Sequence, residues 1–288
     1  MPELPEIEAL ARFLDEEVGG RTVERVFVVA VSALKTYEPA VGALEGRVVE
    51  GVERRGKFLV FGVGAVALVV HLGRAGWVRW NVRMPEAPPR PGKGPLALRV
   101  RLVEPAGVGV DVTEAGSQKH LAVYVVADPL EVPGVARLGP DPLSEGFTSA
   151  AFAGMVRGER RRIKGVLRDQ GVLAGIGNAY ADEILHVARM SPFKVAGTLS
   201  DEEVARVHAA IGATLTDAVA RSRGVGLREL KAEKRSGMRV HGRTGAACPV
   251  CGDTVREVSF SDSSSQYCPT CQTGGKILAD RRMSRLLK

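Results

Sequence analysis

The sequence predicts an α+β protein built from more than one domain. Three observations carry this prediction: strand-like runs follow one another between residues 22 and 126, the hydrophobic period becomes helical after residue 148, and all four cysteines lie in the segment 246–288. With 288 residues, 45% of them hydrophobic, the chain is long enough for two domains with their own cores and a small third module.

The first domain is expected to cover residues 1–127, as a helix followed by strands. Apolar residues at helical spacing predict an amphipathic helix over residues 5–18, which the pair Gly19 and Gly20 ends. The runs that follow are rich in valine and separated by glycine turns, a pattern typical of a β-sandwich or a β-barrel. The expected strands cover residues 22–31, 47–54, 58–63, 65–72, 77–80, 96–103, 108–113 and 121–126.

A stretch dense in proline and glycine, residues 128–147, is expected to link this domain to a helical domain over residues 148–245. In the longest of its helices Ser200 is expected to be the N-cap, and Glu203, three residues later, completes a capping box. The expected helices cover residues 148–157, 163–170, 178–189 and 201–221.

The charge balance points to an anionic partner, with nucleic acid the leading candidate, because the net charge is +7. The N-terminus is acidic and has no basic region before an apolar run, so we expect no signal peptide. The most apolar run, residues 60–72, contains glycines and is too short to span a bilayer. We therefore expect a cytosolic protein without a membrane partner.

The last segment, residues 246–288, is expected to be a zinc finger with a basic tail. Two Cys-x-x-Cys pairs can present four thiolates to one tetrahedral Zn²⁺, and four cysteine ligands leave no open position for catalysis, so the zinc is structural. A redox pair would leave the second Cys-x-x-Cys unexplained. A β-hairpin with its turn at residues 261–265 fits between the pairs. The expected ligands are Cys248, Cys251, Cys268 and Cys271.

The first six residues allow two interpretations. If Met1 is removed, Pro2 carries a secondary α-amine with a pKa near ~8, so that part of it is neutral and can form a Schiff base with a sugar carbon. Glu3 would lie beside that amine as a general acid. In the alternative, Pro2 and Pro5 only start a helix, and Glu3 and Glu6 complement its dipole.

Two further features suggest phosphate contacts. The glycine turn over residues 175–178 leads into a helix that Asn178 is expected to cap, and Lys164 upstream adds charge to this helix N-terminus. The alternative is a plain tight turn between two helices. Lys57 follows Gly56 at the start of a strand, where its side chain can reach into a cleft, and the alternative there is a solvated basic turn.

Taken together, these segments resemble the formamidopyrimidine-DNA glycosylase and endonuclease VIII family of base-excision-repair enzymes. The resemblance covers nearly the whole chain, and the matching segments stand in the family's order. They are Pro2-Glu3-Leu4-Pro5-Glu6, Gly56-Lys57-Phe58-Leu59, His71-Leu72-Gly73, residues 167–185 with Gly175-Ile176-Gly177-Asn178, and Cys268-Pro269-Thr270-Cys271-Gln272. The resemblance implies an N-terminal β-sandwich with a leading helix, a helix-two-turns-helix bundle and a four-cysteine zinc-ribbon β-hairpin.

The resemblance also implies a bifunctional glycosylase with abasic-site lyase activity, acting on oxidised or ring-opened bases. In the family the Pro2 amine attacks C1′ of the damaged nucleotide, Glu3 protonates the deoxyribose ring oxygen, and Glu6 supports the site. A Schiff base forms, and β-elimination then nicks the strand. The alternative is a diverged DNA-binding protein of the same fold that has lost catalysis.

For DNA binding the resemblance implies phosphate contacts from Lys57 and Asn178, with Lys164 as a further expected contact. Phosphate contacts position DNA without specifying the base. The expected partner is damaged DNA, duplex or single-stranded, bound by a monomer in the cytoplasm in association with the nucleoid.

Three positions depart from the family pattern. Arg74 stands where the family usually has methionine, the loop at residues 111–116 lacks the usual arginine and phenylalanine, and Ser263 replaces an arginine of the zinc hairpin. Ala115 is too small to fill the space that a flipped base leaves in the DNA, and Glu114 is expected to repel phosphates. We therefore expect an altered choice of lesion or a preference for non-duplex DNA. Basic residues that could restore phosphate binding are Arg235, Arg239, Arg243, Lys276, Arg281, Arg282 and Arg285.

Overall fold

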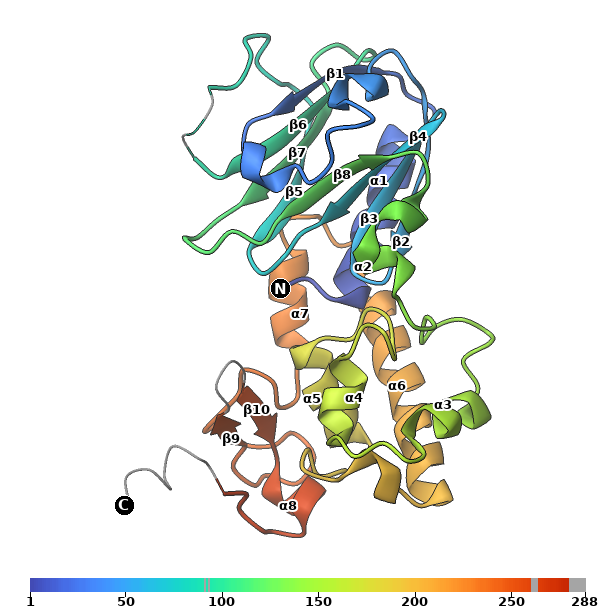
Figure 1. Ribbon diagram of the computed structural model, residues 1–288. Helices are drawn as coiled ribbons and strands as arrows, with labels where there is room; N and C mark the ends of the chain where they lie inside the picture. The colour runs from blue at the N-terminus through green and yellow to red at the C-terminus, as the bar shows by residue number, and fades with distance from the viewer. Residues whose placement is uncertain (91, 93, 260–263, 280–288) are drawn as a thin grey trace, which may run out of the picture. The chain divides into compact units, whose positions relative to one another are not determined.

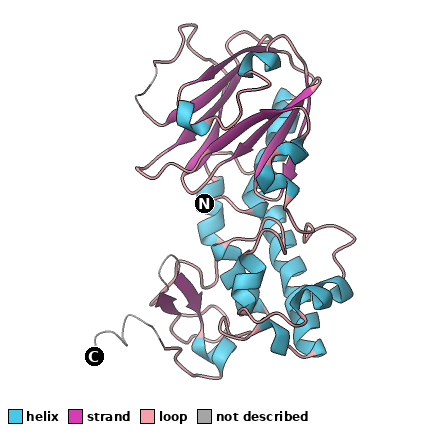
Figure 2. Cartoon of the chain, in the orientation of Figure 1, coloured by secondary structure: helices cyan, strands magenta, loops and turns pink. Residues whose placement is uncertain are grey.

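The computed structural model describes residues 1–90, 92, 94–259 and 264–279. The chain divides into two compact units, Met1–Arg137 with Arg223–Leu230 and Leu138–Ser222 with Lys231–Lys288. Strands dominate the first unit and helices the second (Figure 1, Figure 2). Within the stretch 128–147, residues 128–137 fold with the first unit, where they form η3 (Pro129–Glu131) and α2 (Pro133–Ala136).

Two four-stranded antiparallel sheets build the first unit, in the orders β1-β6-β7-β5 and β2-β3-β4-β8. Side chains from both sheets enter one core, as expected of a β-sandwich rather than a barrel. Every expected strand is present. The strands are β1 (Val23–Val28), β2 (Val49–Arg55), β3 (Phe58–Val63), β4 (Val66–His71), β5 (Gly76–Asn81), β6 (Leu96–Leu102), β7 (Gly109–Glu114) and β8 (Ala122–Val126), with 3-10 turns η1 (Val31–Ala33) and η2 (Val41–Leu44).

The leading helix, α1 (Leu4–Val18), packs against β2 and β3. Its apolar stripe, which includes Ile7, Leu10 and Leu14, is fully buried in the core of the sandwich. Asp15 fixes the helix further, because its Oδ1 accepts the N–H of Val52 in β2 at 2.7 Å. These contacts hold the N-terminal motif at a set position on the first unit.

A segment from late in the chain, residues 223–230, completes the first unit. Leu227 and Leu230 are buried in the sandwich core, and the Trp77 Nε1–H donates to the Leu227 carbonyl at 3.1 Å. The expectation for residues 148–245 groups this segment with the helical domain, and the sequence gives no local sign of its packing. A buried indole N–H needs an acceptor, and here a distant backbone carbonyl supplies it.

The second unit is helical, and each expected helix is present. Its elements are α3 (Ser149–Val156), α4 (Ile163–Arg168), α5 (Asn178–Val187), η4 (Ala196–Thr198), α6 (Asp201–Ser222), α7 (Leu230–Ser236), β9 (Arg256–Ser259), β10 (Ser264–Tyr267) and α8 (Pro269–Thr273). α5 packs against α4, α6, α8 and β10 and is buried along most of its length. None of the helices in the described ranges has the length and apolar character needed to cross a bilayer.

The N-termini of α6 and α5 differ in how they are capped. At α6 the expected capping box is confirmed: the Glu203 N–H donates to Ser200 Oγ at 3.2 Å, and the Ser200 N–H donates to Glu203 Oε2 at 3.0 Å. At α5 the expected cap is wrong, because Gly177 is the N-cap and Asn178 is the first helical residue. The Gln170 side chain instead closes the glycine turn, since it accepts from the Gly175 N–H and donates to the Ile176 carbonyl.

Candidate active site and nucleic-acid interface

The N-terminal motif enters α1 through a reciprocal capping box. The Glu3 N–H donates to Glu6 Oε2 at 2.8 Å, and the Glu6 N–H donates to the Glu3 carboxylate. Glu3 exposes 3% of its surface and Glu6 exposes 2%. The motif therefore does start a helix, and the same hydrogen bonds hold two buried carboxylates close behind Pro2 in the chain.

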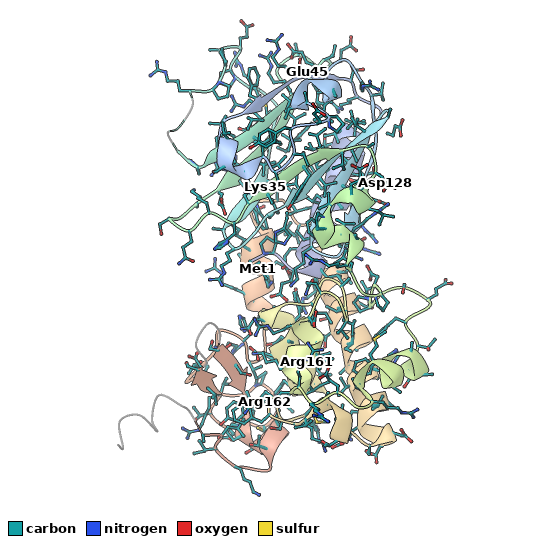
Figure 3. The ribbon with its side chains drawn as sticks, viewed as in Figure 1. Met1, Lys35, Glu45, Asp128, Arg161 and Arg162 are labelled. Atoms are coloured by element: carbon teal, nitrogen blue, oxygen red, sulfur yellow. The ribbon has the colours of Figure 1, made fainter. Side chains whose placement is uncertain are left out.

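The presence or absence of Met1 decides whether the Pro2 nitrogen is an amide or an amine. Pro2 is buried, whereas Met1, labelled in Figure 3, exposes 50% of its surface. While Met1 is attached, the Pro2 nitrogen belongs to an amide, and its lone pair is delocalised into the carbonyl group. Removal of Met1 converts it to a secondary amine, so the nucleophile expected at Pro2 requires that processing step.

Lys57 lies in the turn between β2 and β3, where Gly56 adopts the left-handed φ of +56°. Its side chain exposes 7%, so the alternative of a solvated basic turn is wrong. Strand register sets Phe58 opposite His71, with ring centroids 4.8 Å apart. Burial lowers the pKa of His71 to about 4, and the nearby Lys57 ammonium acts in the same direction. His71 is thus a neutral acceptor, and its Nδ1 receives the Gly73 N–H at 3.3 Å.

Acidification is expected to destabilise the first unit through His71. Its pKa is about 4 in the folded state and near ~6.5 in the unfolded state, so the unfolded state binds more protons between these values. The free energy of unfolding should therefore fall by about 3 kcal/mol as the pH drops through this window. Urea titrations followed by Trp77 and Trp80 fluorescence, which report the first unit alone, measure this fall.

The matched pair for that measurement is His71→Asn, whose side-chain oxygen can still accept from Gly73, and His120→Asn at an exposed histidine. His71→Asn should flatten the pH dependence, and His120→Asn should keep it. Equal slopes in all three proteins would contradict the role assigned to His71.

Glu114 anchors the exposed loop 115–120. Its side chain is buried, and its Oε1 accepts the N–H groups of His120 at 2.6 Å and Leu121 at 2.9 Å, so it holds the loop in addition to the repulsion of phosphates expected from its charge. Lys119 Nζ also donates to the Glu114 carbonyl at 2.7 Å. The anchored loop presses against the turn after β4, where a Cβ on Gly73 would come within 2.7 Å of the His120 backbone.

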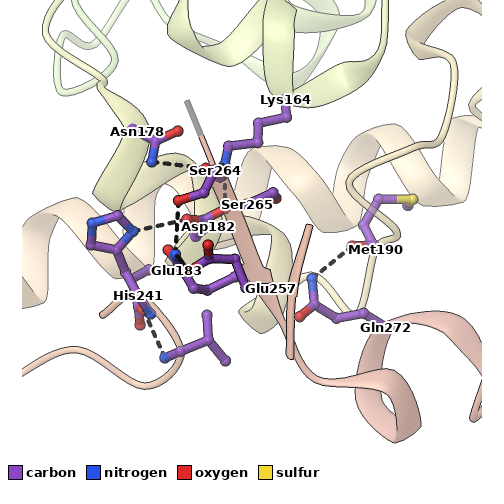
Figure 4. A network of polar contacts seen from close by, with 12 residues as sticks. Lys164, Asn178, Asp182, Glu183, Met190, His241, Glu257, Ser264, Ser265 and Gln272 are labelled. Atoms are coloured by element: carbon purple, nitrogen blue, oxygen red, sulfur yellow. Dashed lines mark hydrogen bonds and ion pairs between the residues drawn. The ribbon is translucent and has the colours of Figure 1, made fainter. Parts of the chain in front are cut away.

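In the second unit the two predicted phosphate ligands converge on the zinc hairpin. Lys164 Nζ and Asn178 Nδ2 both donate to the Ser264 carbonyl, at 2.9 and 3.0 Å (Figure 4). Lys164 exposes only 6% and pairs with Asp182 Oδ1 at 2.6 Å. Asp182 also accepts from Ser265 Oγ at 3.0 Å. These contacts tie the start of β10 to α4 and α5.

The neighbouring Glu183 holds the chain that leads into the zinc finger. Its carboxylate accepts the N–H groups of Arg239, Val240 and His241 at 2.7, 2.9 and 2.8 Å. The His241 Nδ1 lies 2.8 Å from Asp182 Oδ2 (Figure 4). Sequence reasoning missed the role of this acidic pair, although two adjacent acids inside a largely buried helix are a signal that backbone donors lie nearby.

The four expected zinc ligands come together. The Sγ atoms of Cys248, Cys251, Cys268 and Cys271 all lie within 4.8 Å of one another. A tetrahedral site with Zn–S bonds of about 2.3 Å has sulfur–sulfur edges of about 3.8 Å, so the cluster fits one structural zinc. Around the cysteines, a small hydrophobic cluster of described residues contains Val240, Cys248, Val255 and Cys268.

The expected hairpin is confirmed, since β9 pairs antiparallel with β10 from Ser259↔Ser264 to Arg256↔Tyr267. Most of the turn expected at residues 261–265 lies outside the described residues, as do Ser263 and the tail residues Arg281, Arg282 and Arg285. The hairpin presents its described strands beside α5, which is where Lys164 and Asn178 hold it.

Comparison with known proteins finds three family models that match successive parts of the chain. Residues 1–115 match the formamidopyrimidine-DNA glycosylase N-terminal domain, residues 138–228 match the formamidopyrimidine-DNA glycosylase H2TH domain, and residues 245–274 match a zinc finger found in FPG and IleRS. The matched stretches contain the N-terminal motif, helices α3 to α6 and the four cysteines.

One relative extends this match over nearly the full length, and another is more similar over about half of the chain. The formamidopyrimidine-DNA glycosylase of Symbiobacterium thermophilum is 36% identical over 293 residues, covering 98% of this chain and 93% of the relative. An uncharacterized formamidopyrimidine-DNA glycosylase-like protein of Mycobacterium tuberculosis is 64% identical over 151 residues, 52% of this chain and 94% of the relative. The Lactococcus lactis enzyme bound to DNA with an AP site aligns with TM-score 0.81 at 25% identity, covering 94% and 99%. The chain belongs to the formamidopyrimidine-DNA glycosylase family of base-excision-repair enzymes.

Proposed function

We propose that this protein excises oxidised or ring-opened bases from DNA and cleaves the resulting abasic site through the α-amine of Pro2. The observation that carries the proposal is the pair of buried carboxylates, Glu3 and Glu6, locked by reciprocal hydrogen bonds directly after Pro2. A capping box accounts for the buried acids at the helix start but not for their place beside a terminal amine, and amine catalysis on a sugar uses both groups.

The proposed reaction divides the work between Pro2 and Glu3. The neutral amine adds to C1′, and the C1′–N bond to the base breaks, with its electron pair leaving on the base. As that bond breaks, Glu3 gives a proton to the deoxyribose ring oxygen, and the amine nitrogen passes its own proton to the departing base. The ring then opens, and the amine nitrogen and C1′ form an iminium. Loss of a C2′ proton then expels the 3′ phosphate and nicks the strand. The iminium acts as the electron sink for that elimination.

DNA contacts are proposed on both units. Lys57 and Asn178 are proposed to bind phosphates. Lys57 follows Gly56, whose left-handed φ shapes the turn, and Asn178 follows the glycine turn that the Gln170 side chain closes. For Lys164, the internal pairing with Asp182 and Ser264 supports an indirect role, in which it holds the hairpin that lies against the DNA. The protein is proposed to act as a monomer in the cytoplasm, associated with the nucleoid.

Lesion choice is proposed to depend on the loop 115–120, which Glu114 fixes in place. It carries Lys119 and His120 but lacks the large aromatic wedge that the resemblance leads one to expect. A base must leave the stack before it can react, at a cost of a few kcal/mol, and a weaker wedge favours DNA whose stacking is already poor. A panel of single-stranded and duplex oligonucleotides with different lesions tests this preference.

The division of labour between Pro2 and Glu3 predicts a split phenotype for Glu3→Gln. Release of an intact damaged base should slow by about 10²- to 10⁴-fold, because the general acid is lost. Borohydride trapping on a pre-formed abasic site should persist, because that sugar already offers an aldehyde to the amine. Product mobility and adduct yield, measured side by side, check both expectations.

Glu16→Gln is the matched control, since Glu16 lies exposed on the same helix and is expected to keep both activities. Unchanged base release in Glu3→Gln would remove Glu3 from the mechanism. If the unaltered protein gave no adduct with any abasic or damaged oligonucleotide, the proposed function itself would fail, and a binding role without catalysis would replace it.

A further inference from the structure

His186 lies directly against the zinc site, although it is not among the four ligands. It sits near the end of α5, its side chain is buried, and its Nε2 is 3.3 Å from the Sγ of Cys248. The other ring nitrogen, Nδ1, is buried as well and has no hydrogen-bond partner among the described residues. A buried imidazole whose one hydrogen-bonding neighbour in the described part of the chain is a cysteine sulfur is an unusual arrangement that asks for a cause.

The proton position on the ring follows from the surroundings of its two nitrogens. A zinc-bound cysteine is a thiolate and can only accept. A ring with its proton on Nδ1 would bury an unpaired N–H and point the Nε2 lone pair at an anionic sulfur. A ring with its proton on Nε2 donates to that sulfur and leaves only an unpaired acceptor, which is the less costly state.

The helix that carries His186 also holds the rest of the zinc module. Asp182 contacts Ser265 of β10, and Glu183 accepts the N–H groups of residues 239–241. Positions 182, 183 and 186 share one helix face, because residues three and four apart are neighbours on an α-helix. That face therefore reaches the hairpin, the incoming chain and the first cysteine pair.

The second cysteine pair is tied to the turn that follows the same helix. Gln272 donates through Nε2 to the Met190 carbonyl at 2.9 Å, and its Oε1 accepts the Cys268 N–H at 2.9 Å. Both halves of the zinc site are thus anchored on α5 or on the residues just after it. Among the described contacts, His186 is the link that reaches a ligand atom itself.

We propose that His186 is a positioning residue of the zinc site, which donates its Nε2–H to the Cys248 thiolate and so couples helix α5 to the bound metal. Four thiolates around one Zn²⁺ carry a net charge of −2, and a hydrogen bond to one sulfur disperses part of that charge. The bond also makes the sulfur a poorer nucleophile and sets the direction from which Cys248 approaches the metal. This role does not depend on the chemistry at Pro2.

The test compares zinc retention in four proteins: the unaltered chain, His186→Phe, His186→Gln and His208→Gln. His186→Phe fills the space without a donor, and His186→Gln keeps an N–H donor at a similar reach. His208 lies on α6 in the same unit and contacts the Phe147 carbonyl, away from the cysteines, so it serves as the matched control. Zinc transfer to a chromophoric chelator and alkylation of the thiols by iodoacetamide are measured for each zinc-loaded protein.

His186→Phe should weaken zinc retention by about 10- to 100-fold, the range typical of lost outer-shell partners, and should raise the alkylation rate. His186→Gln should recover most of the loss, and His208→Gln should match the unaltered chain. Equal zinc retention in His186→Phe and the unaltered chain would overturn the proposal.

A measurement on the unaltered protein guards against a variant that does not fold. Nitrogen-15 NMR of the histidine rings in the zinc-loaded chain should show His186 protonated at Nε2 and unprotonated at Nδ1. With cadmium-113 in place of Zn²⁺, the cadmium chemical shift should change when His186 is replaced. It should stay the same in His208→Gln. An Nδ1–H tautomer would refute the hydrogen bond directly.

Discussion

Protein that retains Met1 is expected to lose strand nicking and borohydride trapping by about a thousand-fold or more, because its Pro2 nitrogen is an amide and cannot attack C1′. Binding to an abasic-site duplex should change little, since the phosphate contacts proposed for Lys57 and Asn178 do not involve that nitrogen. Intact mass separates the Met1-containing and Met1-free forms, and nicking and fluorescence anisotropy are measured on each. No single substitution in the folded core is expected to separate activity from affinity so completely.

The control for this experiment is enzymatic removal of Met1 from the inactive preparation. Activity should return in step with the fraction of chains that start at Pro2. Equal nicking by both forms would show that another nucleophile opens the sugar. If Pro2 is too buried for the aminopeptidase to act, the mass spectrum will show that Met1 is still attached. Protein from which Met1 is removed during expression then supplies the active form for comparison.

Removal of zinc is expected to unfold the finger and leave the sandwich intact. The hydrophobic cluster around the cysteines has four described residues, two of them ligands, and such a core is too small to offset the loss of chain entropy on its own. Zinc binding contributes on the order of 10 kcal/mol to folding in comparable modules. Chelation, or the substitution Cys268→Ser, should therefore expose the chain beyond residue 237 to proteases and lower DNA affinity at least about tenfold, by the loss of several phosphate contacts.

The two tryptophans make this prediction selective. Trp77 and Trp80 both lie in β5 of the first unit, so their fluorescence should not change on chelation. Re-addition of Zn²⁺ should restore protease resistance and DNA affinity together. Protease resistance that survives complete chelation would mean that the contacts from α5 suffice to fold the finger without metal.

Much of the fold follows from local pattern. The strands of the sandwich are valine-rich runs bounded by glycine turns, and the helix of Ser200 and Glu203 begins with its own capping signal, so short stretches of chain are enough to predict them. The zinc site is equally accessible to prediction, because the spacing of four cysteines is itself the site.

The features that could not be predicted depend on tertiary contacts that residue type and local pattern do not reveal. The charge of Glu114 predicts repulsion of phosphates, yet its carboxylate accepts two backbone N–H groups of the loop that follows. Residue type predicts that Asn178 caps α5, but Gln170 already satisfies the turn, so Gly177 suffices there. Residues 223–230 carry no local mark of the sandwich core that they join.

The capping box at Glu3 and Glu6 links catalysis to the earliest step of helix formation. The Glu3 carboxyl group, the proposed acid, is ordered when the first turn of α1 forms. The entropy cost of ordering it therefore falls on folding, and DNA binding does not add to it. Selection on this motif therefore acts on two properties at once. A change at Glu6 that frays the helix start would also release Glu3, and the activity of the enzyme and the integrity of its first helix should be inherited or lost together.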